Sequence, residues 1–203
     1  MTLPISWRCC RLVLSLASAP FLTTQLHAAL LVLQNSERDC SACAAELDSE
    51  YVSAPKVLAA PGASSGLLLV NFAFRFPLGG YQIVGAAVGA TDSIPFTTRA
   101  RALTRHTVLF HDLPPGVHTL RFIVAEAWRV SKIALEVPSS ADFTVTVTPG
   151  RINYLGTVLV HKTIEVVRDV ERERDSWAAF LKKYPQTPWT DLARARLDSL
   201  AVH

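Results

Sequence analysis

Apolar residues form short runs, separated by turn residues, through most of residues 64–162. The run 67–74 is aliphatic and aromatic, and it stops at Pro77-Leu78-Gly79-Gly80, where glycine permits the positive φ of a tight turn. The run 117–125 is likewise preceded by Asp112-Leu113-Pro114-Pro115-Gly116, in which proline presets φ and glycine supplies the reversal. This pattern predicts short strands joined by tight turns.

The clearest alternation lies in residues 143–148. Phe143, Val145 and Val147 fall on one face of the expected strand and three threonines on the other, as in a sheet with one solvated side. Runs at 81–88, 107–110, 128–137 and 151–160 bring the expected total to about seven strands, a number typical of sandwich domains. Because no helical period separates them, the sequence predicts a mainly β fold, an antiparallel β-sandwich over residues 64–162.

The period changes after residue 162. Apolar residues take helical spacing from 163 to Tyr184, Pro185 ends that pattern, and a second helical stripe follows, so residues 163–203 are predicted to form a helical hairpin. Glu165, Asp169 and Glu173 fall on one i, i+4 row of the first expected helix. We expect this row to be a solvated face, and the alternative is a carboxylate row that attracts a cation or a basic partner.

The first 28 residues have the order of a secretory signal peptide. Arg8 and Arg11 form a basic start, and an apolar stretch follows from 12 to 22. The motif that ends at Ala28 is a poor cleavage site, so an uncleaved membrane anchor stays open as the alternative. We expect an exported protein, either periplasmic or attached to the cell envelope, with residues 29–63 as a flexible linker.

That linker contains the pair Cys40 and Cys43. The spacing is that of a redox C-x-x-C pair, but the strand and helix patterns of a thioredoxin-like unit are not found beside it. In an oxidising compartment we expect a local disulfide between Cys40 and Cys43.

Charge adds little to this picture. The 203-residue chain has 20 basic and 17 acidic residues, a net charge of +3. Such a balance does not favour a nucleic-acid partner, for which a concentrated basic face would be expected. One acid-free stretch, residues 93–111, contains Arg99, Arg101 and Arg105. We expect this stretch to be a solvated connection between strands, and the alternative is that these three arginines bind an anionic lipid or polysaccharide.

The sequence contains no nucleophile elbow, no Gly-rich phosphate loop and no H-E-x-x-H helix. Four histidines lie on or beside expected strands and are the candidate metal ligands: His106, His111, His118 and His161. Asp112 follows His111 and suits either a base with its orienting carboxylate or, as we prefer, a turn. We therefore expect a non-catalytic protein without a cofactor. A redox or metal-dependent enzyme that uses Cys40 and Cys43, or the strand histidines, is the alternative.

Two phrases resemble a known kind of module. Residues 110–120 (Phe-His-Asp-Leu-Pro-Pro-Gly-Val-His-Thr-Leu) and 145–156, which contain Thr-Pro-Gly-Arg-Ile-Asn-Tyr-Leu-Gly, resemble the carboxypeptidase regulatory-like, transthyretin-like β-sandwich modules of bacterial envelope proteins. In such modules the first phrase makes a hairpin and the second opens the last strand. The resemblance covers residues 64–162 and implies a non-catalytic binding or spacer module.

The C-terminal segment resembles something different. Residues 177–189, with 193–197, resemble one hairpin of the tetratricopeptide-like repeats in outer-membrane assembly proteins. A single unit must dock on the sandwich, on another copy or on a partner, because stacked repeats normally bury each other's faces. We expect Trp177, Tyr184 and Trp189 to anchor an envelope protein partner. A carbohydrate- or peptide-binding module is a further alternative.

Overall fold

The computed structural model describes residues 52–75, 78–90, 97–127 and 131–201. Within these ranges two β-sheets are followed by two helices. The first sheet has the order β4 (Thr107–Leu113), β1 (Gly66–Phe74), β8 (Ile152–Val160) and β9 (Ile164–Val167). The second has the order β3 (Thr97–Arg101), β2 (Tyr81–Ala90), β5 (Gly116–Ala127) and β6 (Ser131–Glu136). The helices are α2 (Val170–Lys183) and α3 (Thr190–Ser199).

Two short elements complete the second sheet. The 3-10 turn η1 (Ala141–Phe143) leads into β7 (Thr144–Val147), which pairs with the first residues of β5, whereas β6 pairs with the last. Since β2 already occupies the other edge of β5, β7 and β6 share one edge. Phe143 and Val147 are buried and Thr146 is exposed, so the alternation predicted for this segment is confirmed. None of the helices in the described residues is long and apolar enough to span a membrane.

The predicted β-sandwich is confirmed. Alternate residues of β1 (Leu68, Val70 and Phe72) are fully buried in a core that they share with Leu120 and Ile123 of β5. Neighbouring strands pair antiparallel with one exception, because the central strands β1 and β8 run parallel. The two sheets therefore close over one interior, as period-two burial requires.

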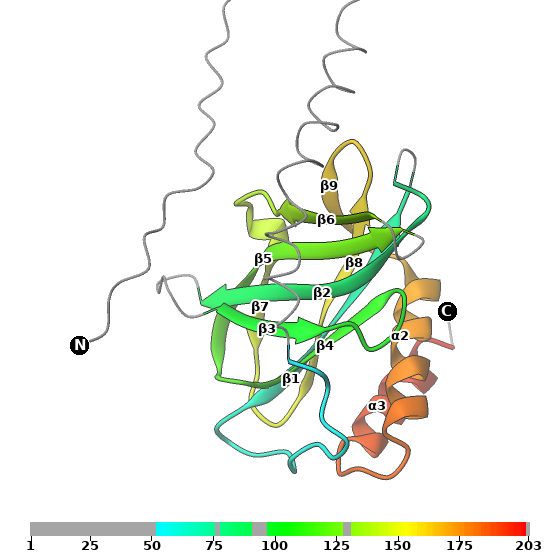
Figure 1. The fold of residues 1–203 in the computed structure, drawn as a ribbon. Coiled ribbons are helices and arrows are strands. Elements are labelled where there is room, and N and C mark those ends of the chain that lie inside the picture. The colour runs from blue at the N-terminus through cyan, green and yellow to red at the C-terminus, as the bar shows by residue number, and fades with distance from the viewer. Residues whose placement is uncertain (1–51, 76–77, 91–96, 128–130, 202–203) are drawn as a thin grey trace, which may run out of the picture. The chain divides into compact units, whose positions relative to one another are not determined.

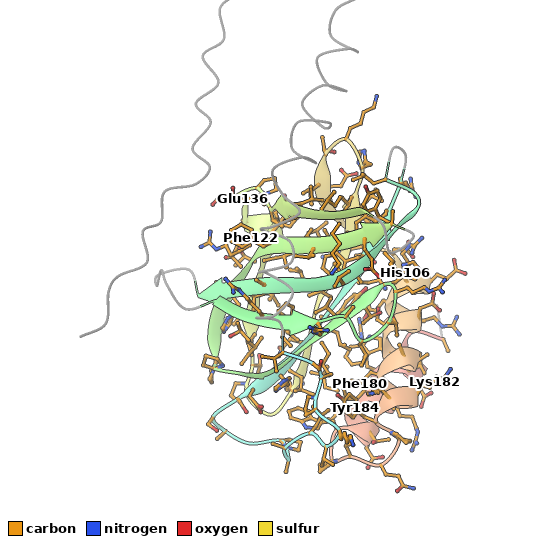
Figure 2. All side chains as sticks on the ribbon, viewed as in Figure 1. His106, Phe122, Glu136, Phe180, Lys182 and Tyr184 are labelled. Carbon is orange, nitrogen blue, oxygen red and sulfur yellow. The ribbon has the colours of Figure 1, made fainter. Side chains whose placement is uncertain are left out.

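The helical hairpin covers the outer face of the first sheet (Figure 1). Leu67 and Leu69, which alternate with the inward residues of β1, contact a second apolar cluster that includes Trp177 and Phe180 of α2. The rings of Phe180 and Tyr184 lie 5.3 Å apart, and Figure 2 shows Lys182 pointing away from the sandwich. The predicted hairpin thus forms a third layer, which packs on the face of β1 that points away from the interior of the sandwich.

Residues 54–59, which we expected to be part of a flexible linker, contact the helical hairpin. The Tyr184 hydroxyl donates to the carbonyl oxygen of Pro55 at 2.8 Å, and the Trp189 indole N–H donates to the carbonyl oxygen of Ala59 at 2.6 Å. Leu58, between them, is 4% exposed and belongs to the hairpin cluster. The expectation of a flexible linker is therefore corrected for residues 54–59, which we call the strap. Residues 29–51 of the expected linker lie outside the described residues.

Two strands differ from the sequence-based expectation. We expected β9 to be the start of the first helix, but Ile164–Val167 pairs antiparallel with β8, and the helix begins at Val170 with Asp169 as its N-cap. The sandwich consequently extends to Val167, beyond the predicted boundary at 162. β3 lies in the stretch that we had interpreted as a connection, and it pairs with β2.

Candidate functional site

A cavity of about 620 Å³ lies where β8 meets the helical hairpin. Its apolar lining comes from both layers: Ile152 and Leu155 of β8, Val170 of α2, and Leu200 after α3. Val170 is 51% exposed, so part of this lining is open to solvent. The volume falls in the range of small-ligand and peptide pockets, which is roughly 300–1,000 Å³.

Glu173 forms the charged wall of this pocket. Its Oε1 accepts hydrogen bonds from Nη2 and Nε of Arg196, at 2.7 and 2.9 Å, and from the Trp177 indole N–H at 3.2 Å. The Glu173 side chain is only 13% exposed. Among the described residues no donor contacts the second oxygen, Oε2, so the pocket contains a carboxylate that still has an acceptor to offer. The contact also joins α2 to α3, because Arg196 comes from the second helix.

Asp169 and Arg168 stand at the junction between β9 and α2. Asp169 accepts the backbone N–H of Arg172 at 3.0 Å and pairs with the Arg172 guanidinium at 3.2 Å, which satisfies the start of the helix. Arg168 is exposed and lines the pocket. Within the part of the chain that the structure describes, no carboxylate lies within ion-pair distance of it. Since Asp169 and Glu173 are both paired with other arginines, Arg168 is the uncompensated charge of the pocket.

Tyr154 also lines the pocket, and its ring lies 6.3 Å from that of Trp177, another lining residue. Burial raises the pKa of Tyr154 to about 12, because the phenolate would lose its hydration. A hydroxyl contact with Thr157 at 3.4 Å opposes this effect, and the nearby Glu173 carboxylate adds to it. Tyr154 is therefore a neutral hydrogen-bonding group at any physiological pH.

One edge of β8 opens onto this pocket. β9 pairs only with residues 157–160 of β8, so the first half of the strand has a neighbouring strand only on its β1 side within the described residues. The carbonyl of Arg151 accepts the Leu67 N–H from β1 at 3.0 Å. Because backbone groups alternate along a strand, those of Ile152 and Tyr154 point to the opposite, unpaired edge. At Leu155 and Gly156 a bulge places two β8 residues opposite one β1 residue, and Gly156 has φ +126°.

The predicted aromatic anchors have another role than expected. Trp177, Tyr184 and Trp189 are 2%, 1% and 2% exposed, and all three belong to the apolar cluster between hairpin, sheet and strap. The expectation of an exposed aromatic docking surface is therefore corrected, because these rings hold the hairpin on the sandwich of their own chain. The expected solvated row is corrected too: Glu165 lies in β9, Asp169 caps α2, and Glu173 is largely buried.

The remaining predicted residues lie away from the pocket. Cys40 and Cys43 are outside the described residues. Arg99 and Arg101 flank the buried Ala100 on β3 and share the outer face of the second sheet, whereas Arg105 is exposed in the turn that leads to β4. Anion binding by these arginines stays a prediction.

The histidines have separate surroundings. His111 Nδ1 lies 2.7 Å from Asp112 Oδ2, His118 Nε2 lies 2.8 Å from the Pro114 carbonyl oxygen, and His161 Nε2 lies 3.0 Å from Glu165 Oε1. Asp112 has φ +55° but lies within β4, where a bulge places His111 and Asp112 opposite Leu67 of β1; the turn that we expected for Asp112 is therefore corrected to a strand bulge. His106 is exposed in the turn before β4. Over the described ranges, no three His, Cys, Asp or Glu side chains gather in a way that could hold a metal.

Comparisons with known proteins found no relative of this chain. The chain matches no family model, no curated protein and no solved structure. Of the pocket residues, only Trp177, as a partner anchor, and Asp169 and Glu173, in the carboxylate row, were proposed as functional residues from the sequence; Arg168, Val170 and Leu200 were not. The strand-to-helix junction at Arg168-Asp169 is a signal that could have indicated Arg168, since polar residues at such junctions commonly line sites.

Proposed function

We propose that this chain is a non-catalytic binding module of the bacterial cell envelope, in which the cavity between β8 and the helical hairpin is the ligand site. The observation that carries the proposal is the composition of that cavity. An apolar lining from Leu155, Val170 and Leu200 lies beside an uncompensated cation, Arg168, and a carboxylate with an unused oxygen, Glu173. Ligand pockets typically combine such apolar surface with a few polar groups that fix orientation.

The architecture supports the same proposal. A two-sheet sandwich over most of residues 64–162 is what the resemblance to carboxypeptidase regulatory-like, transthyretin-like modules implies, and such modules serve as binding or spacer units. The hairpin adds α2 and α3 to this frame and completes the pocket wall through the Arg196–Glu173 contact. In this proposal the envelope location rests on the signal-like residues 1–28. Cell fractionation with sequencing of the mature N-terminus tests it.

Ligand titration with pocket variants tests the binding function. The purified chain is titrated by calorimetry with three probes: a short apolar peptide with one acidic residue, dodecanoate, and a neutral oligosaccharide. Val170→Trp places a large ring at the pocket, and its matched control is Leu192→Trp, on an α3 residue that is 44% exposed and does not line the pocket. We expect one probe class to bind, with a loss of at least about tenfold in affinity for Val170→Trp only. Binding of no probe, or equal affinities for both variants, would contradict the proposal.

A further inference from the structure

The unpaired half of β8 suggests which class of ligand the pocket takes. We propose that residues 152–154 accept an extended peptide segment as an added strand, and that Arg168 selects a segment with an acidic residue. This inference rests on the proposed binding function and names its ligand chemistry. It depends on three features that lie together: a strand edge without a partner strand in the described ranges, a cavity beside that edge and a cation at its end.

The strand edge supplies the main-chain contacts. On the β1 side, Leu67, Leu68 and Leu69 pair with Ile152, Asn153 and Tyr154, so this part of β8 is held in extended form by a central strand of the sandwich. On the other side β9 stops pairing at Thr157, and the chain turns away at Arg168 into α2. The N–H and C=O groups of Ile152 and Tyr154, two residues that line the cavity, therefore point to the edge that β9 leaves open. A rigid strand with unpaired groups is the acceptor that strand addition requires.

The cavity explains why this edge suits an incoming chain. Sheet edges in monomeric proteins are normally short, charged or covered, because an open edge pairs with other chains. Here the hairpin stands off from the edge and leaves about 620 Å³, lined by Leu155 and Val170 on either side. A peptide strand laid along β8 would place alternate side chains toward this apolar lining. The bulge at Leu155-Gly156 limits the added strand to the residues before it.

Charge sets the preference for an acidic peptide. Of the four charged residues that line the pocket, Asp169 and Glu173 are already paired, with Arg172 and Arg196 respectively. Arg168 is the one left without a carboxylate among the described residues, and it directly follows the end of β9, along whose line the added strand would run. A carboxylate on the peptide would complete this ion pair in a partly enclosed site, where such pairs contribute more than on open surface.

The test uses acetyl-Thr-Val-Thr-Val-Glu-amide, titrated by calorimetry into the full chain. Two analogues, each N-methylated at alternate peptide nitrogens, remove the donors along one edge or the other. An added strand bonds β8 through one edge only, so we expect one analogue to lose at least about tenfold in affinity and the other to bind like the parent peptide. Hydrogen exchange should slow at the amides of Ile152 and Tyr154. Equal binding of both analogues, or unchanged exchange at these amides, would overturn the strand addition.

Charge reversal tests the role of Arg168. Arg168→Glu should lower the affinity for the acidic peptide by at least about tenfold. The same variant should bind a peptide with lysine in place of glutamate more tightly than the wild type does. Arg174→Glu, an exposed change on α2 outside the pocket, should leave both affinities unchanged. Equal effects of the two variants would remove Arg168 from the proposal. If dodecanoate or the oligosaccharide binds in a Val170→Trp-sensitive manner and no peptide does, the peptide inference fails while the binding function stands; if nothing binds, both fail.

Discussion

The hydroxyl of Tyr184, at the end of α2, donates a 2.8 Å hydrogen bond to the carbonyl oxygen of Pro55 in the strap. The ring is 1% exposed, and burial raises the pKa of this phenol as well. The contact joins the C-terminal hairpin to the residues that precede the first strand. It shows that the hairpin is built into the domain and is not an appended arm.

Tyr184→Phe should lower the free energy of unfolding by about 1 kcal/mol, because the Pro55 carbonyl loses its donor while the ring keeps its packing. Urea unfolding followed by circular dichroism measures this. Tyr154→Phe is the matched control: its hydroxyl contact with Thr157 is longer, 3.4 Å, so its effect at neutral pH should be smaller. A larger effect for Tyr154→Phe would contradict the role given to the strap.

Tyr154 also predicts a pH dependence of stability. Its pKa is about 12 in the folded chain and about 10 in an unfolded one, so between these values the unfolded state releases the proton first. This contribution to stability is complete below pH 10 and is lost as the pH rises toward 12, a change of about 2 kcal/mol. Tyr154→Phe should therefore lose less stability than the wild type between pH 9 and 11 in urea unfolding. Parallel pH profiles for the two proteins would exclude this mechanism.

A polar contact under α2 gives a third prediction. Asn71 of β1 donates to Ser176 Oγ at 2.9 Å, both residues are buried, and Asn71 Oδ1 has no hydrogen-bond partner among the residues that the structure describes. Ser176→Ala should destabilise the protein by about 1–2 kcal/mol, since the Asn71 amide would lose its acceptor. Asn71→Leu should be neutral or stabilising, because it removes the unsatisfied oxygen together with the amide. Ser199→Ala, at an exposed serine of α3, is the control and should change stability by less than about 0.5 kcal/mol. Greater damage from Asn71→Leu than from Ser176→Ala would refute this interpretation.

Gly156 should not tolerate a side chain. An added Cβ would lie 2.8 Å from Cγ1 of Val166, and the residue has φ +126°. Gly156→Ala should lower the melting temperature strongly, through both backbone strain and the clash that pushes β9 away. Two controls separate these causes: Gly116 has φ +127° with no atom near its Cβ position, and at Gly62 the nearest atom is 3.9 Å away. The expected order of destabilisation is Gly156→Ala, then Gly116→Ala, then Gly62→Ala, by differential scanning calorimetry.

The sandwich could be predicted because its strands carry their own signals. Residues 143–148 alternate without error, and the two prolines before β5, with the glycine that begins it, mark the turn. β3 was not predicted because Thr-Thr-Arg-Ala-Arg has no apolar run: Ala100 is its buried residue on the inner side. Such a segment becomes a strand because it pairs with β2. β9 escaped because four residues, Ile-Glu-Val-Val, satisfy a helical stripe as well as a strand pattern. In both cases tertiary pairing decided the local structure.

The pocket could not be predicted, for a related reason. The Glu173–Arg196 pair joins residues 23 positions apart on different helices, and no spacing rule indicates it. The aromatic residues were predicted to anchor a partner, whereas their burial against the sheet of their own chain depends on Leu67 and Leu69. These two leucines belong to the outward side of a strand that the pattern shows only as apolar. A fully apolar strand such as β1 indicates burial on both faces without showing what covers the second one.

The strap has a consequence for how the chain reaches its native state. The carbonyl groups of Pro55 and Ala59 accept hydrogen bonds from Tyr184 and Trp189, which lie 129 and 130 residues later in the chain. Strand β1 likewise pairs in parallel with β8, which is synthesised much later. A polypeptide that leaves the ribosome N-terminus first cannot form these long-range contacts until residues 152–189 have emerged. Folding of this domain should consequently be slow, and the nascent chain should expose Leu67 and Leu69 until the hairpin has been synthesised.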